Sequence, residues 1–341
     1  MQNGGSLFLR LMIALVFLSL YSCGRKNNNA RLSVMCTEAL DTLARIDGEV
    51  HVQDICVEDS LIVLLTSGNP MLYVLDKNAG SILKKTGFVG HASNEYFMTP
   101  HSINVRNHQV QFMDRGGKQM CYISLSDFSQ KKREMPYTAD FRPSRAVDID
   151  GNLICVGSLS HGRIGVVSAN GGIGLLDYDY PYDTGEVEGI YRGTVFQSEI
   201  RVPSSAGQCL VYSFASDSFE MYKCVSGTLE RTYTSPVNYA PAINKSGSRI
   251  RVDHNRSKAG IIHSAVTDSS VFLMTSELSY NEAAKSGFIG DRITEFRWDG
   301  SRKADYSLPV KASGFCADRE YFYVICEDND GSAVIRVPRM G

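Results

Sequence analysis

The sequence predicts an all-β protein, a six-bladed β-propeller with four-stranded blades, and three observations lead to this fold class. Apolar runs of about five to eight residues recur along the chain, whereas a sustained helical periodicity is hard to find after residue 30. Pairs of these runs joined by a turn repeat six times. After residue 30, no segment rich in Pro, Gly or Ser divides the 341 residues, which argues against two packed sandwich domains.

The repeated unit is a turn, an apolar run, a second turn and another apolar run, as in "DSLIVLLTSGNPMLYVLDKNAG" at residues 59–80. Its copies begin near residues 59, 107, 150, 206, 268 and 318. Most copies also have an apolar run before them and another after them, which makes about four strands per unit. A radial arrangement of such units leaves only short, protected sheet edges. An open solenoid is the alternative.

The ends of the repeat predict how the ring closes. The last copy stops near Pro338, without room for a fourth strand, and we expect the segment 31–46 to supply that strand.

Tryptophan occurs once, at Trp298, which excludes the WD40 class of blade. The insert "ELSYNEAAKSGF" at residues 277–288 predicts a short helix in the fifth unit.

The beginning of the chain predicts export. Arg10 precedes an apolar stretch, residues 11–20, that is too short for a bilayer span of about 20 residues but has the length of a signal-peptide core. The tetrapeptide "LYSC" resembles a bacterial lipobox, so we expect residues 1–22 to be a lipoprotein signal peptide, Cys23 to be lipidated, and residues 23–30 to form a tether. An ordinary secretory signal with a chance cysteine is the alternative. In Bacteroidetes-type lipoproteins, acidic residues directly after the cysteine favour surface display. Basic and neutral residues follow Cys23 here, so this resemblance implies a periplasm-facing position at the outer membrane.

Two stretches carry a resemblance to a known family. The first holds Arg297-Trp298-Asp299-Gly300, Tyr306-Ser307-Leu308, Phe315-Cys316-Ala317-Asp318 and Tyr321-Phe322-Tyr323, and the second holds Gly90, Glu95, Tyr96 and Pro100. Both resemble segments of the TolB-like six-bladed propeller lipoproteins of Bacteroidetes, although Arg297 replaces the usual acidic residue. The resemblance implies the fold and the address. It implies no catalytic residue.

The funnel at one end of the central channel is the expected functional site, formed by the innermost strands and the loops that lead into them. Candidates at those positions are His101, Arg145, Asp148, His161, Arg163, Arg251, His254 and His263. Asp148, Asp150 and Asp268 near the blade starts are either oxygen ligands for a hard cation or ordinary turn residues.

Three further groups of residues are candidates for ligand contact. Glu95 lies in a loop between two histidines, which could bring its pKa into a useful range, or it is solvated. The segment "RIRVDHNR" concentrates arginines, among them Arg251, beside His254, and either binds an acidic glycan or phosphate or forms a solvated loop. Tyrosines in the acidic segment 177–191 suit stacking on carbohydrate or contact with a protein, namely Tyr178, Tyr180 and Tyr182.

The cysteines indicate no metal site, since no CxxC pair or Cys/His cluster has ligand spacing. If "QCLVYSFASDSFEMYKC" is a hairpin that turns at residues 216–217, Cys209 and Cys224 are directly opposed. The pair forms either a disulfide or two buried thiols.

Charge and motifs together predict a binding protein. A net charge of −2 gives no basic footprint for nucleic acid. We expect a monomeric, membrane-anchored binding or scaffolding module without cofactor or metal, whose partner is a protein or glycan of the cell envelope. The alternative is a metal-assisted hydrolase or lactonase with its site at the channel mouth.

Overall fold

The structure is a computed structural model that describes residues 33–35, 40–47, 50–92, 94–185, 187, 189–225, 228–246, 249–328 and 331–339. The predicted signal peptide, the lipidation site Cys23 and the tether lie outside these ranges. The unit Ser33–Gly341 contains all the elements described below.

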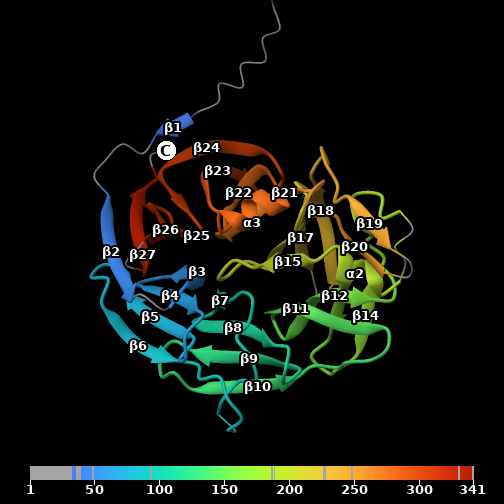
Figure 1. Ribbon diagram of the computed structural model, residues 1–341. Coiled ribbons are helices and arrows are strands. Elements are labelled where there is room, and N and C mark those ends of the chain that lie inside the picture. The colour runs from blue at the N-terminus through green and yellow to red at the C-terminus, as the bar shows by residue number, and fades with distance from the viewer. Residues whose placement is uncertain are drawn as a thin grey trace, which may run out of the picture. The chain divides into compact units, whose positions relative to one another are not determined.

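Six four-stranded antiparallel sheets surround a common axis as the blades of a propeller, which confirms the predicted fold class (Figure 1). Blades one and two are β3 (Val52–Glu58), β4 (Leu61–Thr66), β5 (Leu72–Asp76), β6 (Ile82–Thr86), and β7 (Asn104–Arg106), β8 (Gln109–Asp114), β9 (Gln119–Ser124), β10 (Gln130–Glu134). Blades three and four are β11 (Phe141–Ile149), β12 (Asn152–Leu159), β13 (Ile164–Val167), β14 (Ile173–Leu176), and β15 (Ser198–Arg201), β16 (Gln208–Ser213), β17 (Phe219–Val225), β18 (Thr228–Thr234). Blade five is β21 (Lys258–Val266), β22 (Ser270–Ser279), β23 (Gly290–Arg297) and β24 (Arg302–Ala312), and blade six begins with β25 (Gly314–Ala317), β26 (Tyr321–Asp328) and β27 (Gly331–Pro338).

The ring closes through an N-terminal strand, as the sequence predicts. Strand β2 (Asp41–Asp47) pairs antiparallel with β27 and becomes the outermost strand of blade six. Its Ile46 is buried against the apolar residues of blades one and six. A further strand, β1 (Ser33–Met35), pairs in parallel with the outer strand β24. This pairing was not predicted from the sequence.

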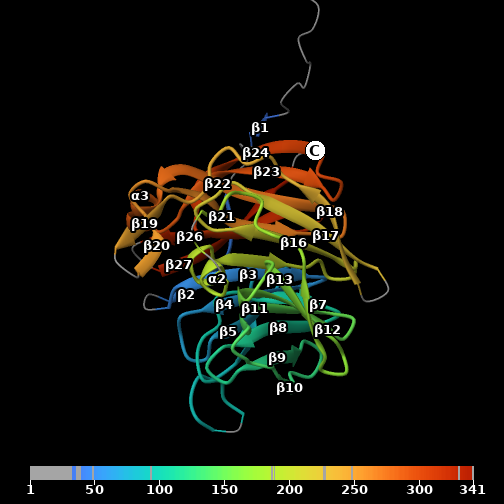
Figure 2. The same ribbon diagram turned by 90° about the vertical axis from the view of Figure 1, so that its right-hand side faces the viewer.

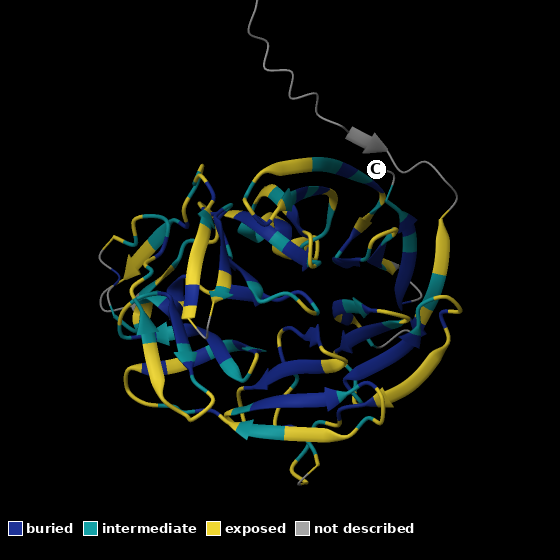
Figure 3. Cartoon of the chain, turned by 180° about the vertical axis from the view of Figure 1, so that it is seen from behind, coloured by how far each residue is buried: buried dark blue, intermediate teal, exposed yellow. Residues whose placement is uncertain are grey.

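Apolar side chains shared between neighbouring blades hold the ring together. In β4 the residues Ile62 to Leu65 are completely buried, whereas the outer strand β10 is polar and largely exposed. Figure 3 shows the same gradient around the ring, from buried inner strands to exposed outer ones. Val63 and Phe112 belong to one cluster that joins blade one to blade two. Each such buried side chain stabilises the fold by about 1.5–3 kcal/mol relative to exposure.

Insertions between and within blades extend one part of the ring. Helix α2 (Tyr191–Val195) precedes blade four, and a hairpin of β19 (Ile243–Ser246) and β20 (Arg249–Val252) precedes blade five. Helix α3 (Tyr280–Lys285) confirms the predicted short helix and begins with a capping box between Ser279 and Glu282. Figure 2 shows α3 and the β19–β20 hairpin towards the same face of the ring, where Asn281 of α3 donates a hydrogen bond to Asn255.

The predicted blade starts all fall at one structural position. The turns near residues 59, 107, 150, 206, 268 and 318 each follow an innermost strand and lead to the second strand of the blade. These turns therefore gather around one end of the axis. No helix among the described residues is long and apolar enough to cross a bilayer.

Candidate functional site

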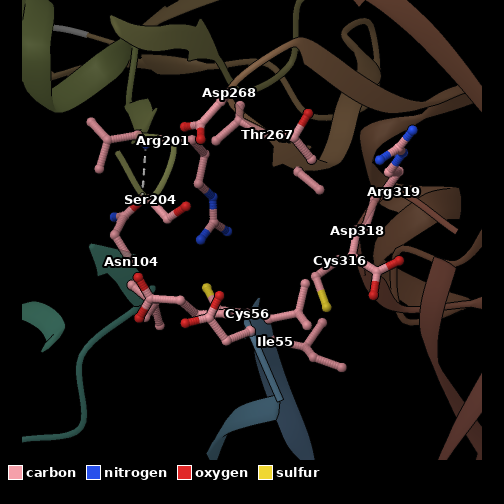
Figure 4. A pocket seen from close by; sticks show the side chains of 18 of the residues that line it. Ile55, Cys56, Asn104, Arg201, Ser204, Thr267, Asp268, Cys316, Asp318 and Arg319 are labelled. Atoms are coloured by element: carbon pink, nitrogen blue, oxygen red, sulfur yellow. Dashed lines mark hydrogen bonds between the residues drawn. The ribbon is translucent and has the colours of Figure 1, made fainter. Parts of the chain in front are cut away.

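A cavity of about 520 Å³ opens at the end of the axis where the innermost strands finish. Five of the six innermost strands contribute to it, and the turns after them form its rim (Figure 4). Its lining comprises residues 55–59, Lys77, Asn104, Val105, Arg201, Val202, Ser204, residues 264–268 and residues 316–320.

A second, much smaller cavity lies at the loops that lead into the innermost strands. Its volume of about 10 Å³ suits a single water molecule. His101 and Arg145, both predicted as site residues, line it together with Arg115. The structure thus brings two candidates together on the predicted face, while the larger cavity occupies the opposite end of the strands.

A buried salt bridge lies behind the wall of the large cavity. The Arg201 guanidinium donates to both carboxylate oxygens of Asp54, over 2.7 Å from Nη1 and 3.1 Å from Nη2. His263 Nε2 lies 3.2 Å from Asp54 Oδ1, and the Ile103 amide donates to Oδ2 over 2.9 Å. Arg201 Nη1 also donates to the Ile103 carbonyl over 2.7 Å. These contacts join four blades at the axis.

Charge keeps this buried carboxylate ionised. Burial alone would raise the pKa of Asp54, but the charge of Arg201 and the contact with His263 outweigh burial, so the pKa falls well below its ordinary value. Burial would likewise lower the pKa of Arg201, and the charge of Asp54 instead holds it well above normal. Two fully charged groups therefore neutralise each other in the interior.

A second ion pair connects this salt bridge to the small cavity. Arg145 Nε donates to Glu199 Oε2 over 3.0 Å, and Ser102 Oγ donates to the other oxygen over 2.9 Å. Burial opposes ionisation of Glu199, yet the charge of Arg145 leaves its pKa below normal. Burial, with the charges of Arg145 and Arg115, lowers the pKa of His101. Buried ion pairs thus occupy the axis between the two cavities.

Three polar atoms around the large cavity are buried without a hydrogen-bond partner. They are Glu58 Oε2, Ser264 Oγ and Arg201 Nε, from residues that are 9%, 2% and 6% exposed. The other Glu58 oxygen accepts from the His108 amide over 3.2 Å, and burial raises the pKa of this carboxyl. Because buried polar groups are normally paired, three unpaired ones around one cavity indicate a place for a ligand or ordered water.

Carboxylates outnumber bases in the lining of the large cavity. Glu58, Asp59, Asp268, Asp318 and Glu320 face Lys77, Arg201 and Arg319. Two of the bases already have acidic partners, since Lys77 donates to Asp318 over 3.0 Å and Arg201 binds Asp54. The mouth therefore carries a negative surplus. Ile55, Val57, Val105, Val202, Ala265, Val266 and Ala317 add apolar surface between these charges.

The three candidate tyrosines pack largely within the protein. Tyr180 is 8% exposed and contacts Phe196, and the Tyr182 ring lies 5.5 Å from the same phenyl ring. Tyr178 lies between Tyr222 and the guanidinium of Arg231, which is 5.0 Å from the Tyr178 ring centroid. These rings fasten the segment 177–191 to blade four.

Arg163, another candidate, is fully buried beneath these tyrosines. It forms a salt bridge with Glu220 and donates to Ser198 Oγ over 3.2 Å and to Ser213 Oγ over 2.9 Å. Its guanidinium lies 5.2 Å from the Tyr180 ring centroid. These contacts form a structural salt bridge between blade three, which contributes Arg163, and blade four, which contributes its three partners.

The remaining exposed candidates lie outside both cavities. His161, Arg251 and His254 are exposed, and His254 stacks on Tyr280 of α3 with ring centroids 4.2 Å apart. Glu95 Oε2 accepts a hydrogen bond from the Ala92 amide over 2.8 Å, a contact within the loop that contains both residues.

The aspartates considered as metal ligands have turn and pairing roles. Asp268 accepts from the amides of Ser205 and Ala206, both over 3.1 Å, while Asp148 accepts from Tyr122 Oη over 2.6 Å. Asp150 pairs with Arg106 over 3.0 Å. Across the residues that the structure describes, no three His, Cys, Asp or Glu side chains are grouped as ligands for one metal ion.

The register of blade four differs from the one that the hairpin predicts. Cys209 is paired with Tyr222, and Cys224 is paired with Leu229 of β18, so the two cysteines are not directly opposed. Neither forms a disulfide in the structure. The turn between β16 and β17 spans residues 214–218, longer than a two-residue turn, which shifts the register.

The main residues that sequence reasoning missed are Asp54, Glu199 and Arg201. Glu199 and Arg201 lie on β15, whose sequence "SEIR" is short and half charged. It gives no apolar run, and it is the one innermost strand that the repeat did not reveal. The signal in the sequence was the pair of opposite charges at Glu199 and Arg201. Residues two apart in a strand point to the same face, so both charges lie on one face of β15.

Comparison with known proteins supports the fold. No family model matches the chain, and no curated protein matches it. Among solved structures, one match is a protein of Bacteroides fragilis NCTC 9343 whose name describes it as exported. The match has a TM-score of 0.57 and 14% identity, and it covers 91% of this chain and 95% of the other. A member of the DUF4221 family from Bacteroides vulgatus ATCC 8482 matches with a TM-score of 0.52 and 8% identity, over 88% and 98%. At these identities the likeness establishes a shared propeller fold, and the resemblance to TolB-like lipoproteins stays a prediction.

Proposed function

We propose that this protein is an exported, lipid-anchored propeller of the cell envelope that binds a ligand in its large axial cavity without catalysing a reaction. The observation that carries the proposal is the 520 Å³ cavity with three unpaired buried polar atoms around it. The lipobox-like tetrapeptide at Cys23 supports anchoring at the outer membrane on the periplasmic side. One structural neighbour from Bacteroides is named as an exported protein, which is consistent with export.

The cavity has the size and rigidity of a small-molecule site. Ligand pockets commonly measure about 300–1,000 Å³ and place a few polar groups on a mostly apolar lining. Here the lining belongs to innermost strands that the buried Asp54–Arg201 pair holds in place. A preformed site loses little conformational entropy on binding, which favours affinity.

The groups around the cavity suit binding better than chemistry. Burial raises the pKa of the Cys56 and Cys316 thiols, so little of the nucleophilic thiolate forms at neutral pH. Asp54 is held as a carboxylate by Arg201 and lies behind the wall. Glu58, the carboxyl with a raised pKa, has neither a hydroxyl nor a thiol as its hydrogen-bond partner.

A native mass spectrometry experiment tests this proposal. The full chain, purified in mild detergent, is incubated with a small-molecule extract of bacterial envelopes and compared with Ser204→Trp, whose indole would fill the cavity that Ser204 lines. Ser81→Trp, at an exposed turn before β6, is the matched control. We expect a mass gain with the wild type and the control but not with Ser204→Trp. The same gain in all three proteins, or no gain in any, would overturn the proposal.

A further inference from the structure

We propose that the ligand of the large cavity carries a primary ammonium group, which Glu58 binds with help from Asp59 and Asp268. This inference rests on the proposed function and names the chemical class of the ligand. Burial, hydrogen bonding and the distribution of charge around the cavity support it.

Glu58 offers an unused acceptor. Its Oε2 atom is buried and accepts no hydrogen bond, and the Nδ1 atom of the exposed His108 ring lies 3.8 Å away. An unpaired buried carboxylate oxygen is costly, and a charged donor is the partner that recovers most of that cost. An ammonium group supplies such donors from a single atom.

The surrounding charges favour a cation over an anion. Asp59 and Asp268 belong to the same lining as Glu58, from the turns after β3 and β21. The Arg201 side chain extends toward the cavity in Figure 4, but its two Nη atoms are already bonded to Asp54 and to the Ile103 carbonyl. At Arg201 two N–H groups remain for an anionic ligand, one at Nε and one at Nη2, and such a ligand would also face the carboxylates of Glu58, Asp59 and Asp268.

The arrangement also favours an organic cation over a metal ion. A hard divalent cation needs several converging oxygen ligands, and in the described part of the chain no such group of three acidic or histidine side chains exists. The apolar lining, for example Val57 and Val266, can cover an aliphatic body attached to the ammonium group.

Titration calorimetry on the full chain in mild detergent tests the assignment with three six-carbon compounds, n-hexylamine, n-hexanol and hexanoate. We expect hexylamine to bind at least tenfold more tightly than the other two. Glu58→Gln keeps the acceptor for the His108 amide but removes the charge, and we expect it to weaken hexylamine binding at least tenfold. Glu134→Gln, at an exposed position of β10, is the matched control and should bind like the wild type.

A second variant covers the case in which Glu58→Gln does not fold. Asp59 is exposed and has a φ of 50°, a conformation that asparagine tolerates, so Asp59→Asn should leave the fold intact. We expect it to weaken hexylamine binding several-fold. Equal binding of the amine, alcohol and carboxylate, or unchanged binding in the folded acidic-site variants, would overturn the assignment.

Two further comparisons identify the source of the ammonium group and distinguish failure of the ammonium assignment from failure of the proposed function. Glycerophosphoethanolamine binding more tightly than hexylamine would identify a lipid headgroup as the source of the ammonium, and weaker binding would identify a free amine. If hexylamine fails while Ser204→Trp still abolishes the mass gain from the envelope extract, the cavity is a binding site and the ammonium assignment alone is wrong. If both fail, the proposed function is wrong as well.

Discussion

Asp54 and Arg201 show how a single pair of charges organises the centre of this propeller. Each residue is almost completely buried, and together they link β3 to β15 across the axis. Taking such charges out of water costs several kcal/mol per ion, so the pair contributes little net stability over apolar residues of equal size. Its value lies in fixing the positions of the strands that form the cavity.

Removing one partner of this pair should be strongly destabilising. Arg201→Met leaves the Asp54 carboxylate buried without its counter-charge, and we expect a loss of about 3–5 kcal/mol in the free energy of unfolding. Urea unfolding of the full chain in detergent measures it. Arg302→Met, which breaks the exposed pair with Asp305, should cost about 0–1 kcal/mol. Equal losses in the two variants would contradict the importance of the axial pair.

Glu58 should make stability depend on pH above its ordinary pKa of 4.5. Burial raises its folded-state pKa above the ordinary 4.5, so the folded protein holds this proton more tightly than the unfolded chain does. The stability that protonated Glu58 contributes is complete below the ordinary pKa and declines as pH rises through the folded-state pKa.

The variant Glu58→Gln removes this dependence. Relative to the wild type it should become more stable as pH rises from 4 to 8, measured as the difference in thermal midpoint between the two proteins. Glu134→Gln, whose side chain is exposed, should follow the wild type across the same range. A difference that stays constant with pH would show that burial does not perturb Glu58.

At the scale of elements, the apolar runs predicted most of the strands. Inner and middle strands bury one or both faces between neighbouring sheets, and their sequences are therefore apolar. Strand β15 escaped detection, since its side chains meet charged partners on other blades instead of apolar ones. The ion pairs at the centre were missed for a different reason, because Asp54 is far in sequence from Arg201, and Arg145 from Glu199. Only the assembled ring brings them together.

The segment 177–191 illustrates a second limit of sequence reasoning. Its alternating Tyr and Asp residues are typical of an exposed binding loop, yet Tyr180 is buried in a cluster with Val195 and Phe196. Ile243 and Val252 of the β19–β20 hairpin pack against that cluster. These partners follow the tyrosines in the chain and show no repeat pattern of their own, so no sequence pattern predicts that they cover the tyrosines.

Closure by β2 makes a prediction at this scale. Ile46 is 2% exposed in the core shared by blades one and six, so Ile46→Ala should lower the free energy of unfolding by about 2–5 kcal/mol. Leu40→Ala, just before β2 and 47% exposed, is the control and should change little. Denaturant unfolding measures both variants, and similar small losses would mean that β2 does not stabilise the closed ring.

At the scale of the whole molecule, the proposed function depends on both the ring and the predicted anchor. If Cys23 is lipidated, the protein should incorporate an alkyne-tagged fatty acid and fractionate with outer membranes. Cys23→Ser should abolish labelling, because the thiol that receives the lipid is gone, and should move the protein out of the membrane fraction. Cys36→Ser is the control. Labelling that persists in Cys23→Ser would disprove the predicted anchor.

The sequence predicted the ring, its blade number and its closure because these depend on repeated local patterns. It placed the expected site at the loops that lead into the innermost strands, whereas the large cavity lies at the opposite end of those strands. The cavity forms where five innermost strands converge and bury Glu58, Arg201 and Ser264, and a local sequence pattern does not show this convergence.

Hydrogen exchange measured on the full chain with and without the envelope extract tests the central claim most directly. If the large cavity binds a ligand, exchange should slow in residues 55–59, 201–204, 264–268 and 316–320, while the outer strands β6, β10 and β18 exchange as before. Protection confined to the opposite face, around His101 and Arg145, or to the outer strands would contradict the claim and place the binding surface elsewhere on the propeller.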